Sequence, residues 1–248
     1  MFKYVVLAII QGFTEFLPIS SSGHLVIFDS IFKPSSDTFF YIVVLHLGTM
    51  ASLLVFFFKD IRKVLGDFST LRKIMIVTFI TGTIGFFGRE FFESLFSDIK
   101  LVLFALFING LIIIFANRKI NTHKKDKPTD VDSLILGLTQ GIGIIPGISR
   151  SGITISTLLI RGVKKEEAFK FSFLAAMPLI VLAFIMEFYH SSTNFLPEKG
   201  IYYLTGFFIS FIVGYLSLFS LSLTIKRSRM DLFGYYCIFM SLLILFLR

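Results

Sequence analysis

The sequence predicts an all-α polytopic membrane protein built from an inverted-topology repeat. Two observations predict this class: long apolar runs occupy most of the chain, and a pattern near the N-terminus recurs in the second half. The 248 residues are 55% hydrophobic and only 16% charged, whereas soluble domains carry nearer 25% charged residues. We therefore expect a single membrane domain over residues 1–248, with no separate soluble domain.

Six apolar runs each approach or exceed the roughly 20 residues that an α-helix needs to cross a bilayer core. The N-terminus could pass for a signal peptide, because Lys3 precedes a short apolar stretch. However, Gln11 and Glu15 follow it without a small-residue cleavage site, so we expect the segment to remain part of the fold. The six runs are residues 38–58, 72–88, 99–117, 168–189, 201–225 and 231–247.

Two stretches, LAIIQGFTEFLPISSSG (7–23) and LGLTQGIGIIPGISRSG (136–152), align without a gap at an offset of 129 residues. Self-similarity at a fixed offset indicates a repeated structural unit. We therefore predict two copies of one unit, residues 1–118 and 130–248. The identical pairs are Leu7/Leu136, Gln11/Gln140, Gly12/Gly141, Ile19/Ile148, Ser20/Ser149, Ser22/Ser151 and Gly23/Gly152.

Each unit begins with an apolar stretch that is too short and too broken to span a membrane. Residues 1–16 and 131–145 are followed by a Pro/Ser/Gly break and then by second short pieces, 23–32 and 152–160. Because non-helical backbone at membrane depth must be buried in protein or line a watery cavity, we predict two re-entrant helical hairpins. Three spans follow each hairpin, so the second unit is inverted relative to the first. In such folds ligand sites lie near the midplane, at the interrupted helices.

Basic residues are shared unevenly between the loops. If the N-terminus lies outside, the inner loops carry 17 of the 24 Lys and Arg residues and the outer side carries six. This bias follows the positive-inside rule in both repeats. The net charge of +8 therefore indicates topology rather than nucleic-acid binding, and we expect both termini on the outer face.

The polar turns between the hairpin helices predict an anion site. Serine is a preferred N-cap, and a helix N-terminus attracts anions. Arg150 stands in the second turn, and a guanidinium binds phosphate oxygens in a bidentate manner. If the hairpins meet head to head, the turns form a pocket for a phosphate or diphosphate; alternatively, the serines only cap the helices. The expected binding residues are Gln11, Ser20, Ser22, Gly23, Gln140, Ser149, Ser151, Gly152 and Thr154.

Glu15 and His24 flank the first turn and are candidate acid–base residues. A carboxylate, an imidazole and nearby hydroxyls can activate a nucleophile, and ionisable groups at membrane depth are functional-site candidates. Gln11 lies one helical turn before Glu15, so both face the same side. The alternatives are structural: Glu15 pairs with Arg150, His24 is a hydrogen-bonded core residue, and the glutamines and Thr154 fill helix contacts.

The stretch QGFTEFLPISSSGHL resembles a motif of the bacterial undecaprenyl-diphosphate phosphatases, the bacitracin-resistance family: Glu/Gln-x-x-x-Glu followed by a Ser-Ser-x-Gly-His turn. PGISRSGIT (146–154) is similar to the second motif of that family. The similarity continues through LHLGT (45–49) and FSFLAAMP (171–178), and so covers essentially the whole chain. Many members carry Glu where this chain has Gln11, which leaves Glu15 as the main acidic group.

The resemblance implies hydrolysis of the terminal phosphate of undecaprenyl diphosphate, which recycles the lipid carrier for cell-wall synthesis and confers bacitracin resistance. Ser21 aligns with Arg150 between the repeats and is the first choice as nucleophile, with His24 or Glu15 as its base; direct attack by water stays open. Arg150 would hold the diphosphate. His46, within LHLGT, is expected to be a packed polar residue.

The resemblance also implies a multi-pass location in the bacterial cell membrane, with the active site opening on the outer face. It implies a divalent cation, Mg²⁺ or Ca²⁺, with Glu15 as the candidate ligand and no organic cofactor. The expected partners are a polyprenyl diphosphate lipid and the bilayer, without nucleic acid. A homodimer is left open.

A second class of function is open from the sequence. Inverted repeats with broken helices also build secondary transporters, so the site could move a prenyl phosphate or another anion, as a transporter or flippase. Transport needs binding groups but no pair of nucleophile and base. Phosphate release by the purified protein would distinguish the two functions.

Overall fold

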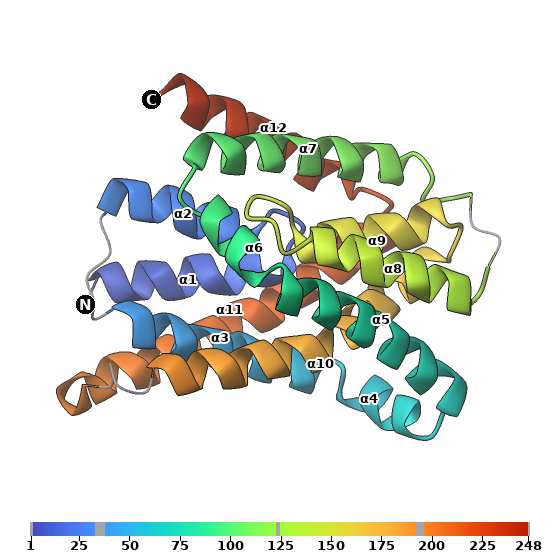
Figure 1. Cartoon of the computed structure of the whole chain (residues 1–248), viewed down its shortest axis with the longest axis horizontal. Coiled ribbons are helices and arrows are strands. Elements are labelled where there is room, and N and C mark those ends of the chain that lie inside the picture. The colour runs from blue at the N-terminus through green and yellow to red at the C-terminus, as the bar shows by residue number, and fades with distance from the viewer. Residues whose placement is uncertain (1, 33–37, 123–124, 192–195, 248) are drawn as a thin grey trace.

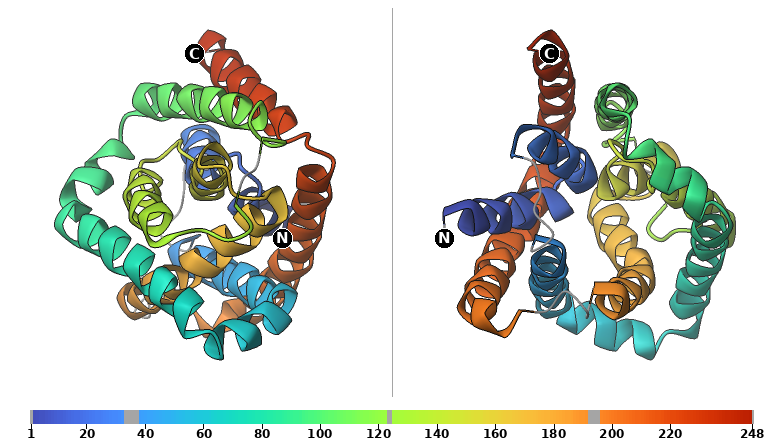
Figure 2. Two further views of the ribbon diagram at one scale, coloured as in Figure 1. Left: turned by 90° about the vertical axis from the view of Figure 1, so that its right-hand side faces the viewer. Right: turned by 60° about the vertical axis from the view of Figure 1, so that its left-hand side comes forward.

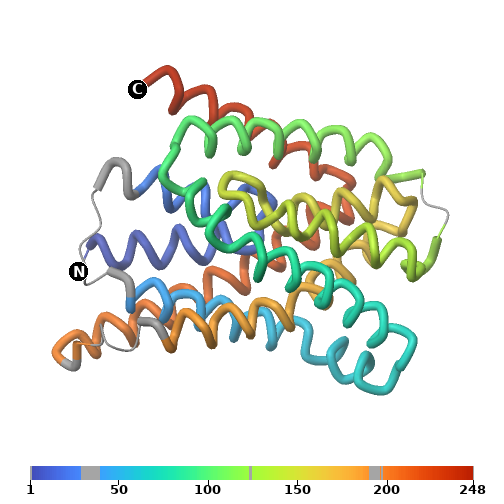
Figure 3. Tube along the Cα trace, in the orientation of Figure 1, coloured from blue at the N-terminus to red at the C-terminus, as the bar shows by residue number. Residues whose placement is uncertain are grey.

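The computed structural model describes residues 2–32, 38–122, 125–191 and 196–247, and within these ranges the chain folds into α-helices and a short 3-10 helix. Figure 3 traces the path of the chain. The first half contains α1 (Phe2–Phe16), α2 (Ser21–Phe32), α3 (Thr38–Phe56), α4 (Phe58–Leu65), α5 (Phe68–Phe87), α6 (Arg89–Leu95) and α7 (Ile99–Asn117). The second half contains α8 (Asp130–Ile142), α9 (Arg150–Ile160), α10 (Lys165–Ser191), η2 (Pro197–Lys199), α11 (Gly200–Lys226) and α12 (Asp231–Phe246).

Four of these helices, α5, α7, α10 and α11, are long and apolar enough to cross a membrane. Helices α3 and α4 form a fifth candidate, bent by 68°, and α12 is a shorter apolar helix. The predicted run 38–58 therefore breaks after Phe56. The cause lies in the sequence of α4, where Lys59 and Asp60 open a charged segment that is costly to keep at membrane depth. The prediction of an all-α, multi-pass membrane protein is confirmed.

Two pairs of short helices enter the molecule from opposite ends, and their tips approach each other near its middle (Figure 1). The first pair is α1 with α2, and the second is α8 with α9; their bounds lie close to the predicted hairpin helices. Helices α3, α5 and α7 follow the first pair in the order in which α10, α11 and α12 follow the second. The division into repeats 1–118 and 130–248, and their opposite orientation in a membrane, stay predictions.

Longer helices surround the hairpins, as Figure 2 shows in its left view. Each hairpin packs against a long helix of the other half, α1 against α11 and α8 against α5. Gly12 and Gly141 permit this close approach: a Cβ on Gly12 would lie 2.7 Å from Cβ of Val213, and one on Gly141 would lie 2.6 Å from Cδ1 of Ile84. These contacts are related by the same offset of 129 residues. The two halves are therefore interlocked.

The loops rich in basic residues meet at one end of the molecule. Lys127 Nζ lies 3.5 Å from the Asp67 carboxylate, and Lys165 Nζ donates to the Lys226 carbonyl oxygen at 2.7 Å. Both chain ends lie at the opposite end (Figure 1). The fold thus separates a basic end from the end that carries the termini.

Asp132 joins three segments at the basic end, outside the membrane spans. Its fully buried carboxylate accepts hydrogen bonds from Lys125 Nζ at 2.8 and 2.9 Å, from Arg161 Nε at 2.8 Å and from the Thr129 amide at 2.9 Å. Burial acts to raise the pKa of Asp132, but the hydrogen bonds from Lys125, Thr129 and Arg161 outweigh it and hold the pKa well below its usual range. Asp132 therefore stays ionised and fixes the start of α8.

Candidate active site

The tips of the two hairpins touch each other. A Cβ on Gly23 would lie 3.2 Å from Cα of Gly147, and the Ser149 hydroxyl lies 3.5 Å from the Leu17 carbonyl oxygen. Gly147 has a φ of +95° and packs against the Val102 carbonyl of α7. Only glycine takes this backbone conformation without strain. The second turn thus lies directly against α7 because Gly147 has no side chain.

Asn109 of α7 links both tips, and sequence reasoning missed it. Its buried side chain donates from Nδ2 to the Pro18 carbonyl oxygen at 3.2 Å and accepts from the Ser149 amide at Oδ1, at 3.0 Å. One amide group thereby satisfies a backbone group in each hairpin turn. The signal in the sequence is an Asn inside the apolar run 99–117, because polar residues in a span usually have a buried partner.

The two serine turns cap their helices in the same way. The Ser20 hydroxyl accepts from the Gly23 amide at 3.1 Å, and the Ser149 hydroxyl accepts from the Gly152 amide at 3.1 Å. Each capping serine also contacts the serine two positions later, Ser22 or Ser151, at 3.2 and 3.1 Å. The turns therefore present two helix N-termini, with their hydroxyls, at the junction of the hairpins.

Glu15 and Arg150 meet at this junction. Arg150 Nη2 donates to Glu15 Oε1 at 2.8 Å, and Gln11 Nε2 donates to Glu15 Oε2 at 3.0 Å. The Ser21 side chain lies near the Glu15 carboxylate, without a hydrogen bond of ordinary geometry between them. The structure thus brings together the candidate base, the candidate nucleophile and the candidate phosphate ligand. The buried Oε1 of Gln11 has no hydrogen-bond partner within the described residues.

A small polar cavity adjoins the ion pair, with a volume of about 10 Å³. Thr154 lies in its wall, where its hydroxyl contacts Ser172 Oγ at 2.5 Å and donates to the Arg150 carbonyl oxygen at 2.7 Å. Gln140 lies elsewhere, because its Nε2 donates to Thr81 of α5 at 3.3 Å. The residues that line the small polar cavity are Glu15, Phe16, Arg150, Ser151, Thr154, Ser172, Phe173, Ala176 and Ile180.

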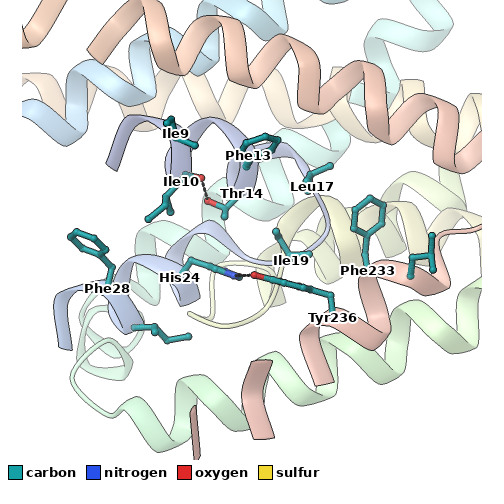
Figure 4. A pocket seen from close by; sticks show the side chains of 12 residues that line it. Ile9, Ile10, Phe13, Thr14, Leu17, Ile19, His24, Phe28, Phe233 and Tyr236 are labelled. Carbon is teal, nitrogen blue, oxygen red and sulfur yellow. Dashed lines mark hydrogen bonds between the residues drawn. The ribbon is translucent and has the colours of Figure 1, made fainter. Parts of the chain in front are cut away.

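His24 lies in a different cavity. Its Nδ1 is 2.8 Å from the Ser20 carbonyl oxygen, its Nε2 is 2.8 Å from the Tyr236 hydroxyl, and its ring stacks on that of Tyr236 (Figure 4). Both ring nitrogens are therefore engaged away from Glu15. The surrounding apolar cavity has a volume of about 620 Å³ and is lined by Ile9, Ile10, Phe13, Thr14, Leu17, Ile19, His24, Ile27, Phe28, Leu232, Phe233 and Tyr236.

His46 of α3 and Glu187 of α10 form a second hydrogen-bonded pair of ionisable residues. His46 Nδ1 lies 2.9 Å from Glu187 Oε2, and His46 interacts electrostatically with both Glu15 and Arg150. The sequence predicted only a packed polar residue at His46 and did not indicate its contact with Glu187. Glu187 follows a long apolar run, and nothing in its local sequence indicates its partner.

The fold and this site define a class: a multi-pass membrane protein whose polar residues gather where two helical hairpins meet. A model of the family described as "Bacitracin resistance protein BacA" matches residues 4–243, and the chain belongs to this family. Three similar proteins carry the name undecaprenyl-diphosphatase. That of Halothermothrix orenii is 35% identical over 253 residues, which cover 100% of this chain and 98% of that protein.

The other two are equally extensive matches. The protein of Treponema denticola is 37% identical over 255 residues, with 96% of this chain and 94% of that protein covered. The protein of Thermosipho africanus is 38% identical over 256 residues, with 98% and 99% covered. The similarity therefore includes both hairpins and all the long helices.

Proposed function

We propose that this protein hydrolyses undecaprenyl diphosphate to undecaprenyl phosphate and inorganic phosphate, the activity that the names of its relatives state. The reaction returns the lipid carrier to cell-wall synthesis and removes the lipid that bacitracin binds. The observation that carries the proposal is the convergence of Glu15, Ser21 and Arg150 at the junction of the hairpins. A secondary transporter has no need for such a set.

The ion pair occupies the place that a phosphate would take. A cavity of about 10 Å³ is no larger than one water molecule requires, so a phosphoryl group enters only if the pair separates. The Arg150 side chain is 34% exposed and that of Glu15 only 10%. We infer that Arg150 turns from Glu15 to the phosphate, because a guanidinium binds phosphate oxygens in a bidentate manner. This exchange leaves Glu15 without its cation and able to accept a proton.

The proposed chemistry begins with Ser21. Its Oγ forms a bond to the terminal phosphorus while the bond from that phosphorus to the bridging oxygen breaks, and undecaprenyl phosphate leaves. The Ser21 proton passes to Glu15. Water then releases inorganic phosphate from Ser21, which regains a proton from Glu15. Arg150 and the two helix N-termini stabilise the charge on the phosphoryl oxygens, as phosphoryl transfer depends mainly on positioning and electrostatics. Direct attack by water is the alternative within the same site.

The residues present suit a divalent cation that arrives with the substrate. No cluster of three His, Cys, Asp or Glu side chains exists among the residues that the structure describes, but Mg²⁺ is commonly held by one or two protein groups and substrate phosphates. Glu15 and the Oε1 of Gln11, which has no hydrogen-bond partner among the described residues, would supply oxygen ligands to this cation. Such an ion would neutralise phosphate charge.

The apolar cavity is the proposed site of the prenyl chain. It lies between α1, α2 and α12, and Figure 4 shows Ile9 and Phe13 at its wall. Gln11 and Glu15 lie on α1 as well, so the tail and the head group contact the same helix. Because the chain leaves lipid rather than water, its burial contributes little net affinity, and specificity resides in the diphosphate.

We also propose that the site opens on the outer face of the cell membrane. The basic loops, which the positive-inside rule assigns to the cytoplasm, lie at one end of the molecule, and both chain ends lie at the other (Figure 1). The first hairpin enters from the end that carries the termini.

Phosphate release from a prenyl diphosphate tests the function. Purified protein in detergent has no second compartment, so release there requires hydrolysis rather than transport. We expect wild-type activity, losses of at least about 100-fold in Glu15→Ala, Ser21→Ala and Arg150→Ala, and a smaller loss in His24→Ala. The control is Arg89→Ala, which removes an exposed ion pair on α6. Absence of release by the wild type, or full activity in Arg150→Ala, would end the proposal.

A further inference from the structure

The pair formed by His46 and Glu187 has no role in the scheme above, yet it lies beside the proposed site. Glu187 is on α10, the helix whose Ala176 and Ile180 line the small polar cavity. Ile180 and Glu187 are two helical turns apart, roughly 10 Å along the axis, and so share one face of α10. The pair therefore continues the wall of the cavity beyond Ile180.

His46, on α3, also lies near the small polar cavity. Phe16, which lines the small polar cavity, and Thr49 both pack against Gly214 of α11. Thr49 in turn donates from its hydroxyl to the His46 carbonyl oxygen at 3.0 Å, one turn away. Helix α3 also packs against α1, which carries Glu15, so His46 approaches the Glu15–Arg150 pair from a third helix, consistent with its electrostatic interaction with both residues.

Glu187 fixes the orientation of the imidazole. With Nδ1 hydrogen-bonded to the carboxylate at 2.9 Å, Nε2 points to the other side of the ring. In the part of the chain that the structure describes, Nε2 has no hydrogen-bond partner. The His46 side chain is 27% exposed, so a ligand can reach it. When it is protonated between the Glu187 carboxylate and a bound phosphate, the imidazole donates from Nδ1 to the carboxylate and from Nε2 to the phosphate.

We propose that His46, oriented by Glu187, binds the second phosphate of the diphosphate head group. This inference rests on the proposed function. Arg150 and the helix N-termini hold one phosphate, and a diphosphate differs from a monophosphate by a second anionic group, joined to the first through the bridging oxygen. The Nε2 of His46, beyond the ion pair, would donate a hydrogen bond to that second phosphate. His46 is then the residue that selects diphosphate over monophosphate.

Binding of two inorganic probes to the full-length protein tests this role. Inorganic diphosphate and inorganic phosphate are titrated into the detergent-solubilised protein by calorimetry, with Mg²⁺ present. A charge-assisted hydrogen bond contributes enough that its loss weakens binding roughly tenfold to a hundredfold. In His46→Ala we expect that loss for diphosphate and less than a twofold change for phosphate. The KM for prenyl diphosphate rises by the same factor while kcat is nearly unchanged.

Two further variants separate binding from support of the fold. His46→Gln keeps an N–H donor, so we expect diphosphate affinity between that of the wild type and His46→Ala. Glu187→Gln loosens the imidazole and gives a smaller loss, whereas Glu93→Gln, in an exposed pair on α6, gives none. Should His46→Ala not fold, judged by its melting temperature, His46→Gln decides the question.

Unchanged diphosphate affinity in the His46 variants would overturn the inference, and so would equal weakening of diphosphate and phosphate. Neither outcome affects the proposed hydrolysis. Conversely, a wild-type protein that binds diphosphate through His46 but releases no phosphate from a prenyl diphosphate would contradict the proposed function alone.

Discussion

Arg150 Nη2 lies 2.8 Å from Glu15 Oε1, although 135 residues separate the two in the chain. Each belongs to a different hairpin, so the pair exists only because the hairpin tips meet. It holds a cation and a potential base together in a half-buried site with almost no free volume. In the proposed mechanism, the substrate therefore competes with Glu15 for Arg150.

Replacement of Arg150 by Lys tests whether the guanidinium acts through its shape as well as its charge. Lysine preserves the ion pair with Glu15 but cannot bind two phosphate oxygens in a planar fork. We expect kcat/KM for phosphate release to fall by roughly 10- to 100-fold, with a melting temperature close to that of the wild type. Equal activity in Arg150→Lys would show that a point charge is sufficient.

The bridge made by Asn109 should be essential for joining the hairpin tips. Asn109→Ala leaves the Ser149 amide buried without a partner and leaves the Pro18 carbonyl with only the Cys237 thiol at 3.6 Å, which costs about 1–3 kcal/mol in the free energy of unfolding. Phosphate release should fall with it, because Ser149 positions Arg150. Thermal unfolding in detergent measures the effect. Asn121→Ala is the matched control, since Asn121 makes an exposed contact with Ser228; equal stability of the two variants would contradict the bridge.

Gly147 offers a test of the contact between the second hairpin turn and α7. Gly147→Ala places a methyl group against the Val102 carbonyl in a left-handed conformation, and we expect it to destabilise the protein by about 2 kcal/mol or more. Gly200→Ala is the control, because a Cβ there meets nothing within 4 Å. A melting temperature unchanged by Gly147→Ala would mean that the second turn does not lie against α7.

Asp132 gives a prediction about pH. Its folded-state pKa is depressed, so its contribution to stability is complete above its ordinary pKa of 3.8 and is lost as the pH falls below that value. Asp132→Asn leaves Lys125 and Arg161 without their anion and should cost about 3 kcal/mol. The gap in stability between wild type and variant should be constant from about pH 8 to 5 and shrink only below about pH 4. A gap that closes near neutral pH would contradict the assignment.

Local signals in the sequence were sufficient to predict the four hairpin helices, but not α4 and α6. The apolar runs and the Pro, Ser and Gly breaks placed α1, α2, α8 and α9 within about three residues of their bounds, because caps and turns depend on neighbours in the sequence. The ion pair of Glu15 with Arg150 was also one of the arrangements the sequence offered. The sequence alone does not distinguish a structural role of this pair from a catalytic one.

Contacts between helices that are far apart in the sequence could not be predicted from local patterns. Asn109 and Glu187 look like isolated polar residues in or beside apolar runs, and their partners depend on the packing of α7 and α10. His24 was expected beside Glu15, but the rotation of α2 about its axis turns the imidazole toward Tyr236 of α12. No periodicity within α2 reports on that rotation, since the partner helix is more than 200 residues away.

Exchange of the two charges tests most directly the claim that Arg150 and Glu15 act on phosphate rather than only on each other. The double variant Glu15→Arg with Arg150→Glu restores an ion pair but reverses the position of each charge. We expect its melting temperature to recover relative to the two single variants, while phosphate release from prenyl diphosphate stays as low as in Arg150→Ala. Recovery of wild-type phosphate release in the double variant would contradict the account.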